Sequence, residues 1–132
     1  MIFPCHHHSI LILPRCNELV DAEKQLTVHD APIVLMIHFK CFTVLGRKLC
    51  HHIDYGEQLS LHTATSKGHK SLSYSLYAVI CNIGGEPCSG HYIACVEHDN
   101  GQWYEMNDGL VCCLTSTPVN LESAYILFYL QN

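Results

Sequence analysis

The stretch GGEPCSGHYIACVEHDNGQWYEMND, residues 84–108, decides how the rest of the chain is interpreted. It reads as a β-hairpin, in which a strand begins at His91 after a glycine-containing loop and a returning strand ends at Asn107 and Asp108. The turn between the strands, Asp99 to Gly101, suits a three-residue connection whose last residue takes the left-handed conformation that glycine allows. That turn predicts that His91 lies diagonally across from Asn107.

Side chains alternate along a strand, so this register puts His91 and Asn107 on one face of the hairpin and Asp108 on the other. A four-residue turn would exchange Asn107 and Asp108, and both remain candidates. A histidine held by an amide or a carboxylate is the base and its orienting group in a catalytic triad. The same pair also occurs as an ordinary structural hydrogen bond, so the hairpin alone does not establish catalysis.

Six blocks of the sequence resemble one protein family and occur in that family's order. They are Pro32–Phe42, Gly46–Lys48, Tyr74–Ile80, Ser89–Tyr92, Gly101–Asp108 and Ala124–Tyr129. These blocks are similar to the C-terminal half of the ubiquitin-specific proteases, a family of cysteine deubiquitinases, over roughly residues 16–130.

The resemblance implies an α+β, papain-like cysteine peptidase fold. This chain would hold most of the antiparallel sheet of the palm and part of the fingers, so residues 16–132 are expected to be a partial catalytic domain. Residues 1–15 are left unassigned and are expected to fray. Because the helical thumb with its nucleophile is missing from these residues, we expect one apolar face of the sheet to be exposed and the isolated chain to be poorly soluble.

The pattern of apolar residues predicts the main elements of that sheet. A strand over residues 33–39 is expected to be covered on both faces, and residues 73–81 should form a central strand with Tyr74, Leu76, Ala78 and Ile80 on one face. Residues 49–54 predict a short strand, 56–70 a surface loop, 119–123 a short helix after Thr117 and Pro118, and 124–130 the final strand.

The site residues follow from the resemblance, position by position. His91 would be the general base and acid, Asn107 would orient it, and Asp108 would position water or the oxyanion region. The loop over residues 84–90, called the glycine loop below, would flank the C-terminal tail of ubiquitin. The expected substrate-binding residues are four from this loop and the residue after His91. They are Gly84, Gly85, Ser89, Gly90 and Tyr92.

Family members carry their nucleophile in a segment of Asn-x-Gly-Asn-Thr-Cys-Tyr character at the start of a helix, where the helix dipole favours a thiolate. None of the nine cysteines of this sequence lies in such a segment. We therefore expect the base-bearing half of a thiol-dependent deubiquitinase that is inactive as an isolated chain. Two alternatives stay open, a non-catalytic ubiquitin-binding module and a remnant scaffold without a ligand.

Composition narrows the partners and the compartment. A formal net charge of −5 and the lack of a basic block argue against nucleic acid and suit the arginine-bearing tail of ubiquitin. No apolar run reaches the roughly 20 residues of a membrane helix. An odd number of irregularly spaced cysteines indicates reduced thiols, hence the cytoplasm or nucleus.

Metal and cofactor sites are not expected. The segment from Cys16 resembles the second zinc knuckle of the fingers, but Leu13 stands where a Cys-x-x-Cys pair would have its first thiolate, so we expect no zinc. Histidines at 6–8 and 51–52 are adjacent in sequence, and adjacent side chains do not converge on one ion.

Overall fold

The computed structural model describes residues 7–12, 15–24, 28, 30–43, 45, 48–49, 52–61, 72–84 and 90–132. The chain divides into two compact units. The first comprises Met1–Ala31 and Ser60–Leu72, and the second comprises Pro32–Leu59 and Ser73–Asn132.

The first unit contains a hairpin of β1 (His7–Ile12) and β2 (Leu19–Lys24). The two strands are antiparallel, with His7 opposite Lys24 and Ile12 opposite Leu19. Asn17, at a φ of 58°, lies in the turn between them. The expectation that residues 1–15 fray is therefore wrong for His7–Ile12, because their apolar run gains backbone hydrogen bonds from a partner strand that the sequence pattern did not reveal.

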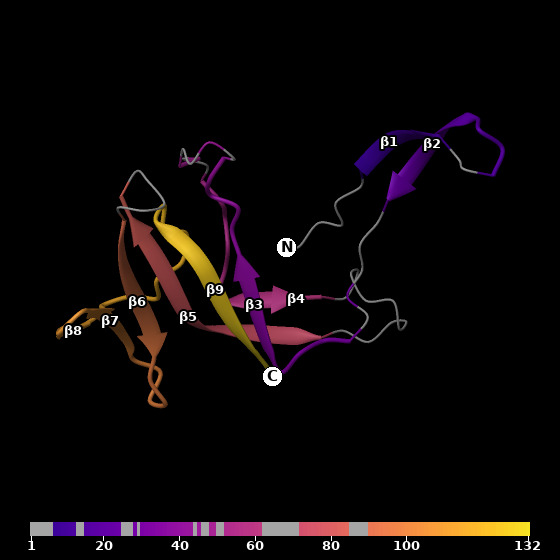
Figure 1. The fold of residues 1–132 in the computed structure, drawn as a ribbon. Coiled ribbons are helices and arrows are strands. Elements are labelled where there is room, and N and C mark those ends of the chain that lie inside the picture. Colours follow the sequence, from indigo (N-terminus) through magenta and orange to yellow (C-terminus); the bar gives the residue numbers. More distant parts are fainter. Residues whose placement is uncertain are drawn as a thin grey trace. The chain divides into compact units, whose positions relative to one another are not determined.

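The second unit is built on a twisted sheet, shown in Figure 1. Within the described residues the sheet has seven strands in the order β3-β9-β5-β6-β7-β8, with β4 pairing to β5 outside this path. The neighbours along the path pair antiparallel. The strands are β3 (Val34–His38), β4 (Gln58–Ser60), β5 (Ser73–Ile83), β6 (His91–Glu97), β7 (Trp103–Asn107), β8 (Leu110–Cys113) and β9 (Ala124–Gln131).

The predicted mostly antiparallel sheet is confirmed, but the described part of the chain contains no helix. The helix expected over residues 119–123 is wrong because Asn120 takes a φ of 55°, which an α-helix does not allow. The side chain of Asn120 instead accepts a hydrogen bond from the backbone N–H of Tyr55 at 2.7 Å. The segment before β9 is thus an irregular connection held by long-range contacts.

β5 is a central strand, as predicted, between β9 and β6. Its expected alternation fails halfway, because the register against β9 shifts between Leu76 and Ala78. Tyr74 and Leu76 are buried before this irregularity, and Val79 and Cys81 are buried after it. One extra residue in a strand makes the side chains after it point to the opposite face from the one that alternation predicts. The residues buried before the irregularity and those buried after it can therefore lie in the same core.

β3 lies at one end of the sheet order. Its side chains alternate between half-buried and exposed, with Met36 59% exposed, so the prediction of a strand covered on both faces is wrong. The strand predicted over residues 49–54 is likewise not formed in its described part, where residues 52–54 are irregular. β4 lies inside the stretch 56–70 that is predicted as a surface loop, and residues 62–70 lie outside the described residues.

One face of the sheet carries the core. Val79, Leu127 and Cys95 point to this face from β5, β9 and β6 and are buried. The alternate residues of β9 and β3 point to the opposite face, where Met36 lies beside Phe128 and Leu130 is 45% exposed. The predicted exposed apolar face is therefore present.

Candidate active site

The turn between β6 and β7 has the geometry that the sequence predicts. The N–H of His98 donates to the carbonyl of Gln102 at 2.8 Å, and the N–H of Gly101 donates to the carbonyl of His98 at 2.8 Å. Gly101 has a φ of 80°, the left-handed conformation that closes a three-residue turn. The four-residue alternative is therefore wrong.

This turn fixes the register of the hairpin. Ala94 lies opposite Met106, so the next residues, Ile93 and Asn107, follow in register and His91 is diagonal to Asn107. Nε2 of His91 lies 2.7 Å from Oδ1 of Asn107. Because the amide oxygen accepts, Nε2 carries the hydrogen, and in the neutral ring the lone pair is on Nδ1. The hairpin thus presents an exposed imidazole whose free nitrogen can take up a proton.

Asp108 lies outside this pair. Asn107 is opposite Leu110, so Asp108 and Gly109 form the two-residue turn from β7 to β8. The φ of Asp108 is 51°, and its side chain is exposed. The strand alternation that directs Asn107 toward His91 therefore leaves Asp108 in the turn.

The glycine loop starts and ends at the same strand pair. Ile83, the last residue of β5, lies opposite His91, the first residue of β6. Gly84 has a φ of 134°, which favours glycine at the start of the loop. Gly90 is packed closely, because a Cβ atom there would meet Nδ2 of Asn82 at 2.6 Å. The predicted substrate residues Gly85 and Ser89 lie outside the described residues.

Lys48 anchors the start of the loop. Its Nζ donates to the carbonyl oxygen of Asn82 at 2.6 Å and to that of Gly84 at 3.0 Å. From the sequence, Lys48 is expected only as part of a turn, with no role at the site. A contact across 34 positions has no local sequence signal.

Tyr92 points to the sheet face opposite His91, as strand alternation requires. Its ring centroid lies 6.0 Å from that of Tyr125, which in turn makes an edge contact with His38 at 4.5 Å and packs near Phe42 at 6.0 Å. The predicted site residues are therefore split, with His91 and Asn107 on one face and Tyr92 on the other.

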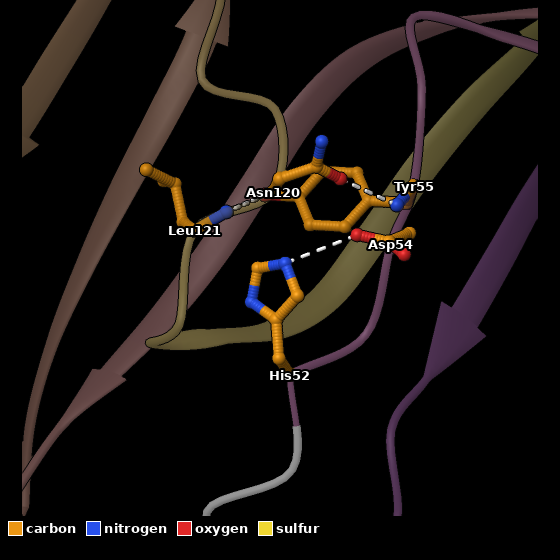
Figure 2. A network of polar contacts seen from close by, with 5 residues as sticks. All are labelled: His52, Asp54, Tyr55, Asn120 and Leu121. Atoms are coloured by element: carbon orange, nitrogen blue, oxygen red, sulfur yellow. Dashed lines mark hydrogen bonds and ion pairs between the residues drawn. The ribbon is translucent and has the colours of Figure 1, made fainter.

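A polar network shown in Figure 2 holds the segment that leads into β9. The hydroxyl of Tyr55 donates to the carbonyl of Pro118 at 2.9 Å and accepts from the N–H of Leu121 at 3.2 Å. Burial raises the pKa of Tyr55 to about 12. Nearby, Nε2 of His52 lies 3.0 Å from a carboxylate oxygen of Asp54. This network is structural, since it ties the exposed connection to the core.

Three of the described cysteines, Cys41, Cys81 and Cys95, lie in surroundings that disfavour a reactive thiolate or keep it from a substrate. Cys81 and Cys95 are buried, as predicted for small apolar side chains. A hydrogen bond from Cys95 lowers the pKa of Cys81 to about 7, but Cys81 is fully buried and cannot meet a substrate. Burial raises the pKa of Cys41, which disfavours its thiolate. Cys5, Cys50 and Cys88 lie outside the described residues.

Metal-binding clusters and membrane-spanning helices are both absent from the described residues. Their histidine, cysteine and acidic side chains form no group of three or more that could hold a metal ion. They also include no helix long and apolar enough to cross a membrane.

Comparison with known proteins identifies the class to which this fold and hairpin belong. The family model described as ubiquitin carboxyl-terminal hydrolase matches residues 2–129, and the chain belongs to this family. The match includes most of the N-terminal segment that the sequence pattern leaves unassigned.

Two curated relatives illustrate the similarity. The chain is 41% identical over 119 residues to ubiquitin carboxyl-terminal hydrolase 17-like protein E of Mus musculus, covering 89% of this chain and 22% of the relative. It is 35% identical over 120 residues to ubiquitin carboxyl-terminal hydrolase 23 of Arabidopsis thaliana, covering 89% of this chain and 14% of the relative. The chain therefore spans less than a quarter of the length of either relative.

Solved structures show the same fold. The structure of the SAGA Ubp8/Sgf11/Sus1/Sgf73 DUB module bound to ubiquitin aldehyde contains a chain that matches with a TM-score of 0.80 and 28% identity, over 98% of this chain and 31% of that one. A yeast SAGA DUB module matches with a TM-score of 0.82 and 31% identity, over 96% and 31%. The sheet described above thus corresponds to part of a ubiquitin-specific protease catalytic domain.

Proposed function

We propose that these residues form the base-bearing half of a thiol-dependent deubiquitinase that hydrolyses the bond after the C-terminal glycine of ubiquitin. The 2.7 Å contact between His91 and Asn107 carries this proposal. The exposed His91 begins β6 beside the glycine loop, and its Nδ1 has no hydrogen-bond partner among the described residues.

The reaction needs a proton acceptor and donor at two stages. Nδ1 of His91 takes the proton of a cysteine thiol, and the thiolate attacks the carbonyl carbon of the ubiquitin glycine. The same nitrogen then protonates the leaving amine, and a thioester remains. A water molecule gives its proton to His91 and hydrolyses the thioester, which regenerates the thiol. Asn107 keeps the ring in one tautomer and orientation throughout.

The thiol and the oxyanion donors are assigned to sequence that these 132 residues do not contain. Triad members act as a unit, so a polypeptide of these residues alone is expected to be inactive. Asp108, exposed in the adjoining turn, is proposed to position water or the oxyanion region.

Ubiquitin is the proposed partner. The solved relatives include the SAGA DUB module bound to ubiquitin aldehyde and another bound to monoubiquitin, which supports ubiquitin as the ligand of this region. Gly84, Gly85, Ser89, Gly90 and Tyr92 are proposed to flank its tail. A net charge of −5 suits a basic partner. We place the chain in the cytoplasm or nucleus, since Cys16, Cys112 and Cys113 are free and exposed.

A chimera tests the catalytic assignment. The 119-residue segment of this chain that matches the mouse 17-like protein E replaces its counterpart in that protein, and hydrolysis of a fluorogenic ubiquitin substrate is measured. We expect activity in the chimera and a loss of about 10³-fold or more in His91→Ala. His98→Ala is the matched control, because His98 also contacts an asparagine, Asn100, at 3.2 Å on the same hairpin. Unchanged activity of the His91→Ala chimera would show that His91 is not the general base.

A ubiquitin-binding module without catalysis is the second candidate, favoured because Cys81 and Cys95 are buried and burial raises the pKa of Cys41. The 132-residue chain is incubated with ubiquitin bearing a C-terminal thiol-reactive group, and separately titrated with fluorescent ubiquitin. Saturable binding without labelling supports the module. Labelling that depends on His91 would show that the chain has its own nucleophile.

A further inference from the structure

A cavity of about 500 Å³ lies at the start of the glycine loop. Small-molecule sites have volumes of about 300–1,000 Å³, so this cavity is large enough for a ligand. Its apolar wall comes from residues after β3 and before β9, among them Phe39, Leu49 and Leu121. Ile53 and Ile83 also line it and are exposed, so a ligand can enter from solvent.

Asn82 is the unexplained polar group of this cavity. It lines the cavity and is only 1% exposed, yet neither Oδ1 nor Nδ2 has a hydrogen-bond partner in the part of the chain that the structure describes. Its backbone is satisfied, because its N–H donates to Ser123 at 2.8 Å and its carbonyl accepts from Lys48. A buried amide without partners is unfavourable, so a ligand that supplies one donor and one acceptor would stabilise it.

Lys48 places a positive charge at the same residue. The described residues supply acceptors for two of the three ammonium hydrogens, the carbonyl oxygens of Asn82 and Gly84. The remaining hydrogen can bind an anionic oxygen. Glu122 also lines the cavity, but its side chain is exposed, and His52 is paired with Asp54.

We propose that this cavity binds an N-acylated amino acid with an apolar side chain. The carboxylate binds Lys48, the amide group pairs with the side chain of Asn82, and the apolar part contacts Phe39, Leu49 and Leu121. In such a ligand one carbon atom separates the amide from the carboxylate, which suits a cavity where Nζ of Lys48 bonds the backbone carbonyl of the same residue, Asn82, whose side-chain amide has no partner among the described residues. The same chemistry occurs in free N-acyl amino acids and at peptide C-termini.

This site is separate from the proposed catalytic pair. It uses Lys48 and Asn82 rather than His91 and Asn107, so it can exist whether or not the region catalyses. The two sites adjoin, since Asn82 packs against Gly90, the residue before His91.

Cys41 provides the readout, because it lines the cavity and is partly exposed. The 132-residue chain is alkylated with iodoacetamide, and each cysteine is followed by peptide mass spectrometry. We expect N-acetyl-L-leucine to slow alkylation of Cys41 and not of Cys112, which is exposed on β8. N-acetyl-L-leucine amide should protect about tenfold more weakly, because it lacks the charge-assisted contact to Lys48.

Two variants assign the contacts. Lys48→Met keeps the length of the side chain without its charge, and Asn82→Leu keeps the approximate size without the amide. Both should lose protection of Cys41, whereas Ser75→Ala, whose hydroxyl bonds Gln58 and Asn132 away from the cavity lining, should keep it. If Asn82→Leu does not fold, Lys48→Met and the acid and amide probes still decide the matter.

The outcomes separate the possible ligands. Equal protection by a five-residue peptide ending in leucine points to peptide C-termini, and protection by the free compound alone points to N-acyl amino acids. Unchanged alkylation of Cys41 in the presence of N-acetyl-L-leucine, or full protection of Lys48→Met, would overturn the proposal.

Discussion

The side chain of Asn82 occupies the space next to the α-carbon of Gly90. A Cβ atom on Gly90 would meet Nδ2 of Asn82 at 2.6 Å and the carbonyl oxygen of Ile83 at 3.4 Å. Gly90 directly precedes His91, the first residue of β6, so this packing helps to position the backbone that carries the imidazole.

Gly90→Ala should therefore destabilise the chain, by about 1–3 kcal/mol, because the added methyl group displaces a buried side chain. Urea unfolding of the single and double variants measures the effect. Asn82→Ala makes room for the methyl group, so the double variant should lose less than the sum of the two single losses. Additive losses would mean that the two residues do not compete for space.

Asn107→Ala should lower kcat/KM of the chimera by about 10²-fold or more, because the ring of His91 loses the acceptor that fixes its tautomer. Asn107→Asp should retain more activity, since a carboxylate oxygen can accept from the same Nε2–H. The comparison separates an acceptor from a mere filler of space. Equal rates for the two variants would contradict the positioning role of Asn107.

The sequence predicted the hairpin because its geometry is local. A glycine at the end of a three-residue turn fixes the pairing of His98 with Gln102, and strand alternation then determines which residues meet further along the two strands. The irregularity of β5 after Leu76 and the left-handed Asn120 depend on partners far along the chain, and the alternation of apolar residues contains no sign of them. The contact of Lys48 with Asn82, and the cavity beside it, escaped prediction for the same reason.

Gly101 provides a test of the turn. Its φ is 80°, and a Cβ atom added there would have nothing within 4 Å, so Gly101→Ala should destabilise by about 1 kcal/mol through backbone strain alone. Gly109→Ala is the matched control, since Gly109 also has open space but no left-handed φ. Its free energy of unfolding should change by less than about 0.5 kcal/mol. The reverse order would show that the turn is not formed.

The free energy of unfolding should fall as the pH rises from about 10 to 12. Burial raises the pKa of Tyr55 and of Tyr129 to about 12. In the unfolded chain these hydroxyls ionise near pH 10, so the unfolded state releases protons first and is favoured in this window. Each tyrosine should contribute about 1–2 kcal/mol after allowance for solvent screening.

Urea unfolding at pH 9 and pH 11 measures this difference. Tyr129→Phe should reduce the loss between the two pH values, because phenylalanine has no group to ionise. Tyr77→Phe is the control. Tyr77 is half-buried beside Phe128, and its hydroxyl takes no part in the hydrogen bond of Tyr55 to Pro118 or of Tyr129 to Gly56. If Tyr129→Phe loses as much free energy of unfolding between pH 9 and pH 11 as the wild type, the pH dependence comes from other groups.

Met36 and Leu130 should make the isolated chain self-associate. Both side chains extend from the sheet face opposite the core, on the adjacent strands β3 and β9, and Val34 beside Leu130 is 43% exposed. Apolar side chains grouped on an edge strand favour contact with a second chain. Light scattering of the 132-residue chain should detect oligomers that dissociate in Met36→Lys/Leu130→Lys. Lysines placed at Leu110 and Val111, exposed on β8, test whether the effect belongs to this face. A monodisperse wild-type monomer would contradict the expectation.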